Sequence, residues 1–321
     1  MDQPAADQHA SGGWPRRLDA AAAAVAGVSR RRAQRLIADG MVTLNGRVTA
    51  AGDKGKLIGE HDAVAVSDEV GRVVSEPDAA LTVLAAGEGW VAIDKPAGAP
   101  VHPLREGETG TVLNAVAARY PEVQGVGRSG GEGGLKSGVV HRLDVETSGV
   151  LLVALDETRW QRFREAFAGH TTEKMYTAVV AGRPRDVGRA DLRLAITRHK
   201  PARVEAIPPD PDHPRFAASR RCTLSWRTTK RLADATRLDV SLDTGFLHQI
   251  RATFAHLGHP VLGDPLYGYA TPVNEQHVED HVPPLIAPRL MLHASSLRLG
   301  EIEVQSPLPD SFTATVTRLK K

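Results

Sequence analysis

The sequence predicts an α+β protein in which a small basic α/β domain precedes a larger domain with a mixed, mostly antiparallel sheet and flanking helices. After residue 80, strand-like segments outnumber helical ones and lack the regular alternation of a doubly wound parallel sheet. Seven arginines but two acidic residues lie between Arg16 and Arg47, so positive charge is concentrated in one short stretch. Such a stretch is typical of a surface that docks a polyanion, although a solvated helix face has the same composition.

The basic stretch is expected to form two helices followed by a hairpin. The Ala-rich segment 18–25 has a helical pattern, and Ser29 is placed to cap a second helix that Gly40 ends. Asn45 and Gly46 predict a tight turn between strands at 41–44 and 47–48, and a third strand follows at 63–66.

The larger domain is expected to begin with two strands in the segments LTVLAA and WVAID, from residue 81. Helical patterns follow at 112–120, around Trp160, Phe163 and Phe167, and at 248–257. Further strands are expected at 150–155, 175–180, 192–196, 222–226 and 237–242, with a Pro-rich surface loop at 207–216.

Composition limits the class of protein. The single cysteine, Cys222, excludes an internal disulfide framework and a thiolate metal cage. No run approaches the roughly 18 apolar residues that cross a bilayer, and the first residues do not resemble a secretion signal. We therefore expect a cytoplasmic protein without a membrane partner.

The most informative string is VVHRLDVETSGVLLVAL, at 139–155. A polar loop here leads into a strand that reads as buried, so Asp144 would be fixed at the edge of the core by a rigid element, as a catalytic carboxylate requires. Composition alone favours a structural Asx-turn at Asp144, which Thr147, Ser148 and Gly149 would complete.

The motif HRLDxxTSG resembles the signature of the pseudouridine synthases that act on large-subunit ribosomal RNA and related substrates. Three other segments resemble this family in order and spacing, namely WVAIDKPAGAPVHP at 90–103, TTEKMYTAVVAG at 171–182 and TGFLHQIRATFAHLGHPVLGDPLYG at 244–268. The resemblance implies a pseudouridine synthase fold and an isomerase, with Asp144 as nucleophile or base, Tyr176 packed on the target base and Arg251 paired with Asp144. It also implies substrate contacts from His141, Arg142, Thr147 and Gln249, with Arg142 filling the gap left by the displaced uridine.

These residue types suit the reaction. The glycosidic bond must break, the uracil must rotate while bound, and a new bond must form through carbon 5, so an anion can act covalently or stabilise positive charge on the ribose. No redox step occurs, and we expect no nucleotide cofactor and no metal. Singly, Tyr176 also fits a strand core and Arg251 a helix arginine that extends to solvent.

The segment from about Arg16 to Val66 resembles an S4-type RNA-binding domain, on the string RRRAQRLIADGMVTLNGRV. This implies that Arg30, Arg31, Arg35 and Arg47 contact RNA, mainly its phosphates. We expect a disordered tail at 1–15, the S4-like domain at 16–68, a linker at 69–78 and the catalytic domain at 79–321. We expect the partner to be RNA, and ribosomal rather than transfer RNA. We expect the protein to bind it as a monomer.

The sequence departs from the family in its third motif, where Phe246 and Leu247 replace an arginine and a threonine, and Thr253 replaces a histidine. This departure leaves an alternative function open: a non-catalytic RNA-binding or ribosome-assembly protein on the same scaffold.

The glycines at 125–130 fit G-x-G-x-x-G, but they lack the preceding strand and following helix of a dinucleotide site. His248, His256 and His259 lack acidic partners and the HExxH pattern of a zinc site.

Overall fold

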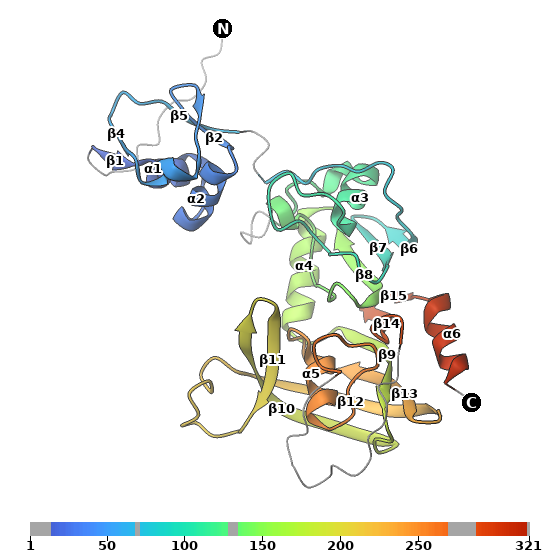
Figure 1. Cartoon of the computed structure of the whole chain (residues 1–321). Coiled ribbons are helices and arrows are strands. Elements are labelled where there is room, and N and C mark those ends of the chain that lie inside the picture. Colours follow the sequence, from blue (N-terminus) through green and yellow to red (C-terminus); the bar gives the residue numbers. More distant parts are fainter. Residues whose placement is uncertain (1–13, 68–70, 128–133, 269–286, 320–321) are drawn as a thin grey trace. The chain divides into compact units, whose positions relative to one another are not determined.

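A computed structural model describes residues 14–67, 71–127, 134–268 and 287–319. The chain divides into two compact units (Figure 1). Unit 1 comprises residues 1–73 with 104–108, and unit 2 comprises 74–103 with 109–321. Parts of three sequence expectations, the tail at 1–13, the linker at 68–70 and the glycine-rich stretch at 128–130, lie outside the described residues.

Unit 1 is built on two helices and short strands. Ser29 caps the second helix, its hydroxyl accepting a hydrogen bond from the backbone N–H of Arg32, as the sequence predicts. Apolar side chains from both helices, including Leu18, Leu36 and Ile37, are completely buried with Val42. The elements of the unit are β1 (Arg16–Arg17), α1 (Leu18–Ala26), α2 (Arg30–Ala38), β2 (Val42–Leu44), β3 (Arg47–Val48), η1 (Ala51–Gly55), β4 (Leu57–Ile58) and β5 (Val64–Val66).

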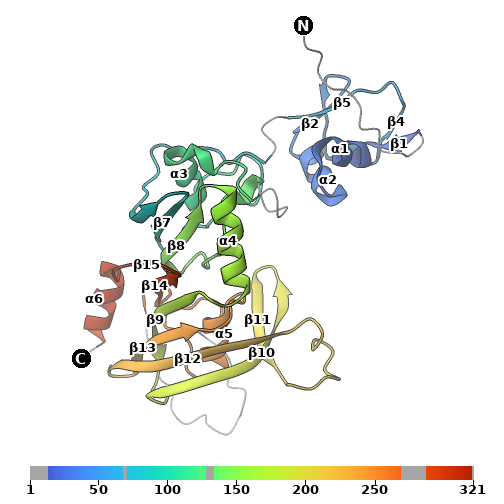
Figure 2. The same ribbon diagram turned by 180° about the vertical axis from the view of Figure 1, so that it is seen from behind.

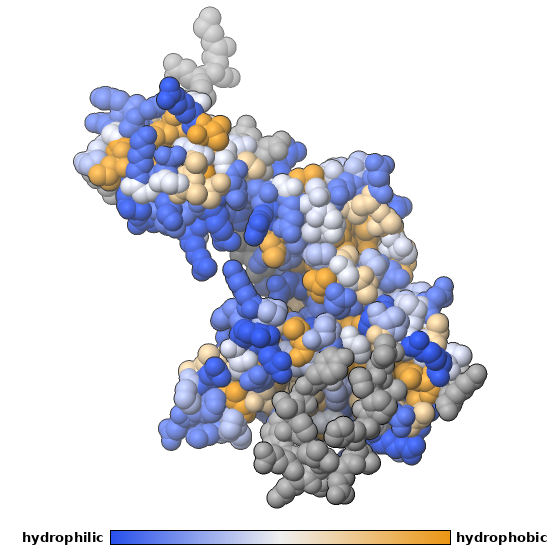
Figure 3. Space-filling view, viewed as in Figure 1, coloured by the Kyte–Doolittle hydropathy of each residue, from blue (hydrophilic) through white to orange (hydrophobic). Residues whose placement is uncertain are grey.

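Two strand pairings organise unit 1. β2 lies between β3 and β5, and the hairpin turn at Asn45 and Gly46 has positive φ at both residues, which these two residue types tolerate best. β1 and β4 form a separate antiparallel pair, which the sequence analysis did not predict because each is two residues long. Hydrophilic residues cover much of the face of unit 1 visible in Figure 3.

Unit 2 contains, among the described residues, a ten-stranded sheet in the order β11-β10-β12-β13-β9-β14-β8-β7-β6, with β15 paired to β14. The strand pairings in the described part of this sheet are antiparallel except for β14 with β8, so the sheet is mixed and mostly antiparallel, as predicted. The strands are β6 (Val83–Gly87), β7 (Trp90–Lys95), β8 (Ser148–Ala154), β9 (Glu173–Ala181), β10 (Val187–His199), β11 (Ala202–Ile207), β12 (Arg220–Arg231), β13 (Ala235–Leu242), β14 (Leu292–Leu299) and β15 (Ile302–Gln305).

Helices cover the sheet in separate places. In Figures 1 and 2, α3 lies beside β6–β8 and α5 beside the strands of the other half. Capping explains where two of them start: Thr111 and Asn114 form a reciprocal capping box for α3, and Asp156 accepts from the N–H of Arg159 at the start of α4. The helical elements are α3 (Val112–Arg119), η2 (Pro121–Val123), η4 (Gly134–Lys136), α4 (Glu157–Ala168), α5 (Gln249–His256) and α6 (Asp310–Arg318).

The sheet order brings together segments that are distant in sequence. β14, from the carboxyl-terminal part of the chain, pairs with β9 on one side and with β8 on the other. The segment that carries Asp144 therefore lies one strand away from the strand that carries Tyr176. No helix in the described part of the chain has the length and apolar character needed to span a membrane.

We predict that unit 1 loses stability in acid through Asp19. This carboxylate is completely buried and accepts from Arg17 at 3.2 Å, Arg30 at 3.0 Å and Gln34 at 2.7 Å. Burial by itself would raise the pKa of Asp19, but these hydrogen bonds outweigh it and lower the pKa to about 2. Because the unfolded carboxyl titrates at about 3.9, the stabilisation is present above pH ~4 and is lost as the pH falls towards 2.

The size of this effect is about 1 kcal/mol, since Arg17 and Arg30 are half exposed and solvent screens their charges. Amide hydrogen exchange in α2, corrected for intrinsic exchange rates, should show protection falling between pH 4 and 2. The Asp19→Asn variant should show lower protection at pH 6 and a flatter acid dependence; an unchanged acid dependence would contradict this assignment.

Candidate active site

The site is organised around the guanidinium of Arg251 on α5, whose side chain is only 4% exposed. Its Nε and Nη2 donate to the two oxygens of Asp264 at 2.7 and 2.8 Å, a bidentate pair. Its Nη1 donates to Oδ2 of Asp144 at 3.0 Å. Asp264 thus holds the edge of the guanidinium formed by Nε and Nη2, and Nη1 remains to bind Asp144.

The two carboxylates differ in exposure. The side chain of Asp264 is completely buried, whereas that of Asp144 is 20% exposed. Burial alone would lower the pKa of Arg251, but hydrogen bonds and charge pairing with Asp264 and Asp144 raise it above its ordinary value. Arg251 is therefore a permanent buried cation that faces a carboxylate accessible to a substrate.

Asp264 is fixed by the turn in which it lies. Its Oδ1 also accepts from the backbone N–H groups of Leu266 and Tyr267, at 2.9 and 3.1 Å. The ring of Tyr267 lies 5.2 Å from the guanidinium carbon of Arg251, and its hydroxyl accepts from the N–H of Val204 on β11. The arginine is consequently held by a carboxylate and an aromatic face that the protein itself orients.

Lys95 anchors the loop of Asp144 by binding Val145, the residue that follows Asp144. The ammonium of Lys95 is completely buried and donates to the carbonyls of Pro96, Ala99 and Val145, at 2.8, 2.7 and 2.9 Å. Three N–H donors thus meet three acceptors. The Val145 carbonyl also accepts from the N–H of Gly98 at 2.8 Å, and burial lowers the pKa of Lys95 to about 8.

The other end of the loop is anchored by a chain of buried polar groups. Arg289 donates to the hydroxyl of Ser148 at 2.7 Å, so the Ser148 proton is directed to Nδ1 of His293, 2.8 Å away. Burial lowers the pKa of His293, which keeps the ring neutral and lets its Nε2 donate to the Ser306 carbonyl. The donor and acceptor roles along this chain are therefore determined by the structure.

Gly149 allows the loop to approach β14 closely. Its φ is +114°, and a Cβ atom there would lie 2.2 Å from the carbonyl oxygen of Ala294. No side chain fits in this space, so the glycine of the HRLDxxTSG string is needed by the backbone of the site.

Tyr176 is half-buried on β9. Burial raises the pKa of its phenol, and the negative charge of Asp144 raises it further, so the ring is a neutral donor beside the anion. The structure thus brings together Asp144, Arg251 and Tyr176, the three residues expected to be catalytic.

The four residues expected to contact substrate differ in their surroundings. Arg142 is exposed, beside Leu143 and Asp144 in the loop. Thr147 is buried, and its hydroxyl has no hydrogen-bond partner among the described residues. Of these two, Arg142 offers an accessible polar group to a substrate, whereas the protein encloses the Thr147 hydroxyl, so the expected substrate contact of Thr147 is not formed by this arrangement.

The other two already have partners. The Nε2 of His141 accepts from the N–H of Leu152, its ring stacks on Phe167, and burial lowers its pKa to about 3. The buried amide of Gln249 accepts from Thr244 and from the N–H of Phe246, and donates to the Thr223 carbonyl. In this structure both side chains hold the framework of the site together, a role that sequence spacing does not reveal.

The arginines expected to bind RNA lie on unit 1. Arg31 and Arg35 are exposed on α2, and Arg47 is exposed on β3. Arg30 is half exposed and also donates to Asp19, so part of its charge is neutralised within the protein.

Sequence reasoning missed Asp264, Lys95 and Tyr267. Asp264 and Tyr267 lie in the same 244–268 string as Arg251, and a completely buried acid is the partner that a buried arginine needs. Lys95 lies in the 90–103 segment that resembles the family, but lysines are seldom completely buried, so its residue type does not mark it as an anchor.

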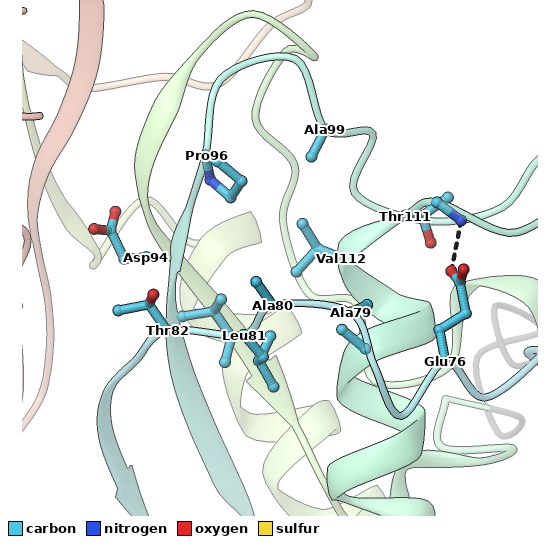
Figure 4. Close-up of a pocket in the computed structure, with 13 residues that line it drawn as sticks. Glu76, Ala79, Ala80, Leu81, Thr82, Asp94, Pro96, Ala99, Thr111 and Val112 are labelled. Carbon is cyan, nitrogen blue, oxygen red and sulfur yellow. Dashed lines mark hydrogen bonds between the residues drawn. The ribbon is translucent and has the colours of Figure 1, made fainter. Parts of the chain in front are cut away.

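A hollow of about 140 Å³ lies in the amino-terminal half of unit 2 (Figure 4). Its lining is mostly apolar, with Thr82 and Asp94 near one end and Glu76 near the other, where Glu76 accepts from the N–H of Gly110. None of the expected site residues lines it, and so it is separate from the ion pair of Asp144 and Arg251.

We predict that Asp264 contributes much more to stability than Asp144. Asp264→Asn leaves a buried guanidinium without half of its charge pairing, which should cost about 3 kcal/mol or more. Asp144→Asn removes a partly exposed partner and should cost about 1 kcal/mol or less. Urea denaturation of the full chain measures both, and equal losses would show that Asp264 does not hold the arginine as described.

Comparisons with known proteins agree with this geometry. The sequence model of the RNA pseudouridylate synthase family matches residues 89–256, a range that contains Asp144, Tyr176 and Arg251. An uncharacterised RNA pseudouridine synthase of Synechocystis sp. is 31% identical over 304 residues, covering 92% of this chain and 86% of that protein. The ribosomal large subunit pseudouridine synthase D of Yersinia pestis is 31% identical over 300 residues, covering 91% of this chain and 87% of that protein.

A solved structure shares the fold. The human RNA pseudouridylate synthase domain containing 4 protein superposes with a TM-score of 0.57 at 20% sequence identity, covering 74% of this chain and 92% of that chain. The family match, the relatives and the ion pair on the mixed sheet lead to one conclusion: the chain belongs to the RNA pseudouridine synthase family and is an isomerase that acts on RNA.

Proposed function

We propose that this enzyme isomerises specific uridines to pseudouridine in structured large-subunit ribosomal RNA, with Asp144 as its catalytic carboxylate. The observation that carries this proposal is a partly exposed carboxylate held at 3.0 Å by a buried arginine. The relatives named as ribosomal large subunit pseudouridine synthase D support the choice of RNA.

The pairing places a permanent cation against the carboxylate of Asp144. Arg251 keeps its positive charge throughout the reaction, and Asp264 binds only one edge of its guanidinium. The second edge therefore stabilises negative charge on Asp144 while RNA excludes water. An anion placed in this way can form a covalent bond to the nucleotide, or remove a proton, as the glycosidic bond to N1 breaks and the bond to C5 forms.

Tyr176 and Arg142 have supporting roles in the proposed mechanism. A target uridine must leave its stack, which costs a few kcal/mol. The half-buried neutral ring of Tyr176 offers a planar surface to the displaced base, and the exposed Arg142 can occupy the space that the base leaves.

Unit 1 is proposed to be an S4-like RNA-binding domain at 16–68, joined by 69–78 to the catalytic domain at 79–321. Its two helices, the Ser29 cap and the β2–β3 hairpin support this assignment. Arg31 and Arg35 lie four residues apart on α2, so they share one side of that helix and can contact successive phosphates.

The departure at Phe246 and Leu247 fits an active enzyme. Both side chains pack against a buried apolar cluster that includes Leu194, Ala252 and Tyr267. They join the loop before α5 to the strands beneath it, and the ion pair of Arg251 is intact.

We predict that wild-type protein releases tritium from total RNA labelled at carbon 5 of uridine, prepared from cells that lack the gene, and that Asp144→Asn lowers the rate at least 1000-fold. Loss of the anion removes the charge that acts on the nucleotide, while the amide keeps a similar shape. RNA binding by the variant should stay within about threefold of wild type. Binding without tritium release by the wild type would instead support an RNA-binding or ribosome-assembly protein.

We predict that Arg31→Ala with Arg35→Ala weakens RNA binding and flattens its salt dependence. Removing two phosphate contacts should lower the slope of log K against log salt by about 1.5 to 2. Turnover at saturating RNA should stay within about twofold, because neither residue belongs to the site of Asp144. An unchanged salt slope would remove the RNA-binding role proposed for unit 1.

A further inference from the structure

Lys174 is a buried lysine near the site whose charge is not used by the interactions described above. It lies on β9, and its exposed fraction is 8%. Side chains alternate along a strand, so Lys174 projects from the same face of β9 as Tyr176, two residues later. Its charge helps to lower the pKa of His141, which precedes the Asp144 loop.

The ammonium of Lys174 has no hydrogen bond and no ion pair among the described residues, in contrast to that of Lys95. Burial lowers its pKa, and the charge of Asp243 opposes this lowering. Asp243 itself is in an ion pair with Arg189, at 2.9 Å. The stem of Lys174 is buried, but its Nζ is not one of the enclosed, unpartnered side-chain atoms of the described residues, so the ammonium stays accessible to a ligand that supplies negative charge.

The surroundings of the ammonium leave a path for such a ligand. A Cβ atom on the exposed Gly245 would lie 3.9 Å from Nζ of Lys174 and would contact nothing else within 4 Å. Gly245 does not have positive φ, so the backbone does not require glycine there. The missing side chain thus leaves open space directly over the ammonium.

The loop above the lysine has no charge of its own, since Thr244, Gly245, Phe246 and Leu247 are all uncharged. An anion that approaches over Gly245 therefore meets no charge on these four residues before it reaches Lys174 on β9. Phosphate oxygens carry the full negative charge that offsets the desolvation of a buried ammonium better than a neutral uracil carbonyl does.

We propose that Lys174 binds a backbone phosphate of the RNA beside the target uridine, reached over Gly245, and so positions the nucleotide against Tyr176 and Asp144. This inference rests on the proposed function. It adds a positioning residue and a phosphate subsite to the site.

Two substitutions test the subsite from both sides, with tritium release from the same carbon 5-labelled RNA as the readout. Lys174→Met removes the cation, and Gly245→Val covers it without removing charge. Each should raise KM about tenfold and leave kcat within about twofold. For Lys174→Met, the slope of log K against log salt should fall by the equivalent of about one phosphate contact. Lys174→Arg keeps the charge and should keep most of the affinity for RNA. Lys230→Met, on the half-exposed Lys230 of β12, is the matched control and should match wild type.

Thermal unfolding separates this role from a structural one. Because the apolar stem of Lys174 is buried and its ammonium has no partner among the described residues, Lys174→Met should keep or raise the melting temperature while it raises KM. A lower melting temperature with unchanged KM would make Lys174 a structural residue and overturn the proposal. A lower kcat with unchanged KM and salt slope would mean contact with the base and would also overturn it. Absence of release by wild type would refute the proposed function instead, and that result is distinct from any of these.

Discussion

The buried guanidinium of Arg251 is the constraint on which the rest of the site depends. A cation in the interior is tolerated only if its donors are met by acceptors with good geometry. Asp264 meets two of them and is itself held by the N–H groups of its own turn, while Asp144 meets a third. Arg251 thus serves both the stability of the fold and the chemistry of the site. Of its two carboxylate partners, Asp144 is the partly exposed one, and so it is the one that can act on a substrate.

The loop of Asp144 is fixed at two points that follow Asp144 in the chain, Val145 and Ser148. Lys95 binds the carbonyl that follows Asp144, and the chain from Arg289 through Ser148 to His293 ties the start of β8 to β14. These anchors limit the freedom of the residues directly after Asp144, and Arg251 holds its carboxylate, which matters because a catalytic group must be held within a fraction of an ångström of its working position. The anchors come from β7, β8 and the segment leading into β14, so the position of one aspartate depends on much of unit 2.

Local patterns predicted most elements correctly. The two helices and hairpin of unit 1, α3, α5 and the strands β8, β9, β12 and β13 all follow from short-range signals such as Ser29, Asn45-Gly46 and runs of apolar residues. The short pair β1–β4, the hairpin strand β11 and the carboxyl-terminal β14, β15 and α6 were not predicted. Their residues carry weaker local patterns. Pairing with a strand distant in sequence stabilises β1, β4 and β14, pairing with the neighbouring strand stabilises β11 and β15, and α6 packs Phe312 and Val316 into a buried cluster.

The sequence by itself determined the residue types of the site and their order, because the strings around Asp144, Tyr176 and Arg251 are specific enough to resemble one family. Only the tertiary structure decided which side chains meet. Asp264 as the second partner of Arg251, Lys95 and His293 as anchors, and Gln249 as a brace all depend on contacts between segments that the sheet order brings together. The physical reason is that a buried polar group must find its partner in three dimensions, and spacing along the chain does not record which distant residue satisfies it.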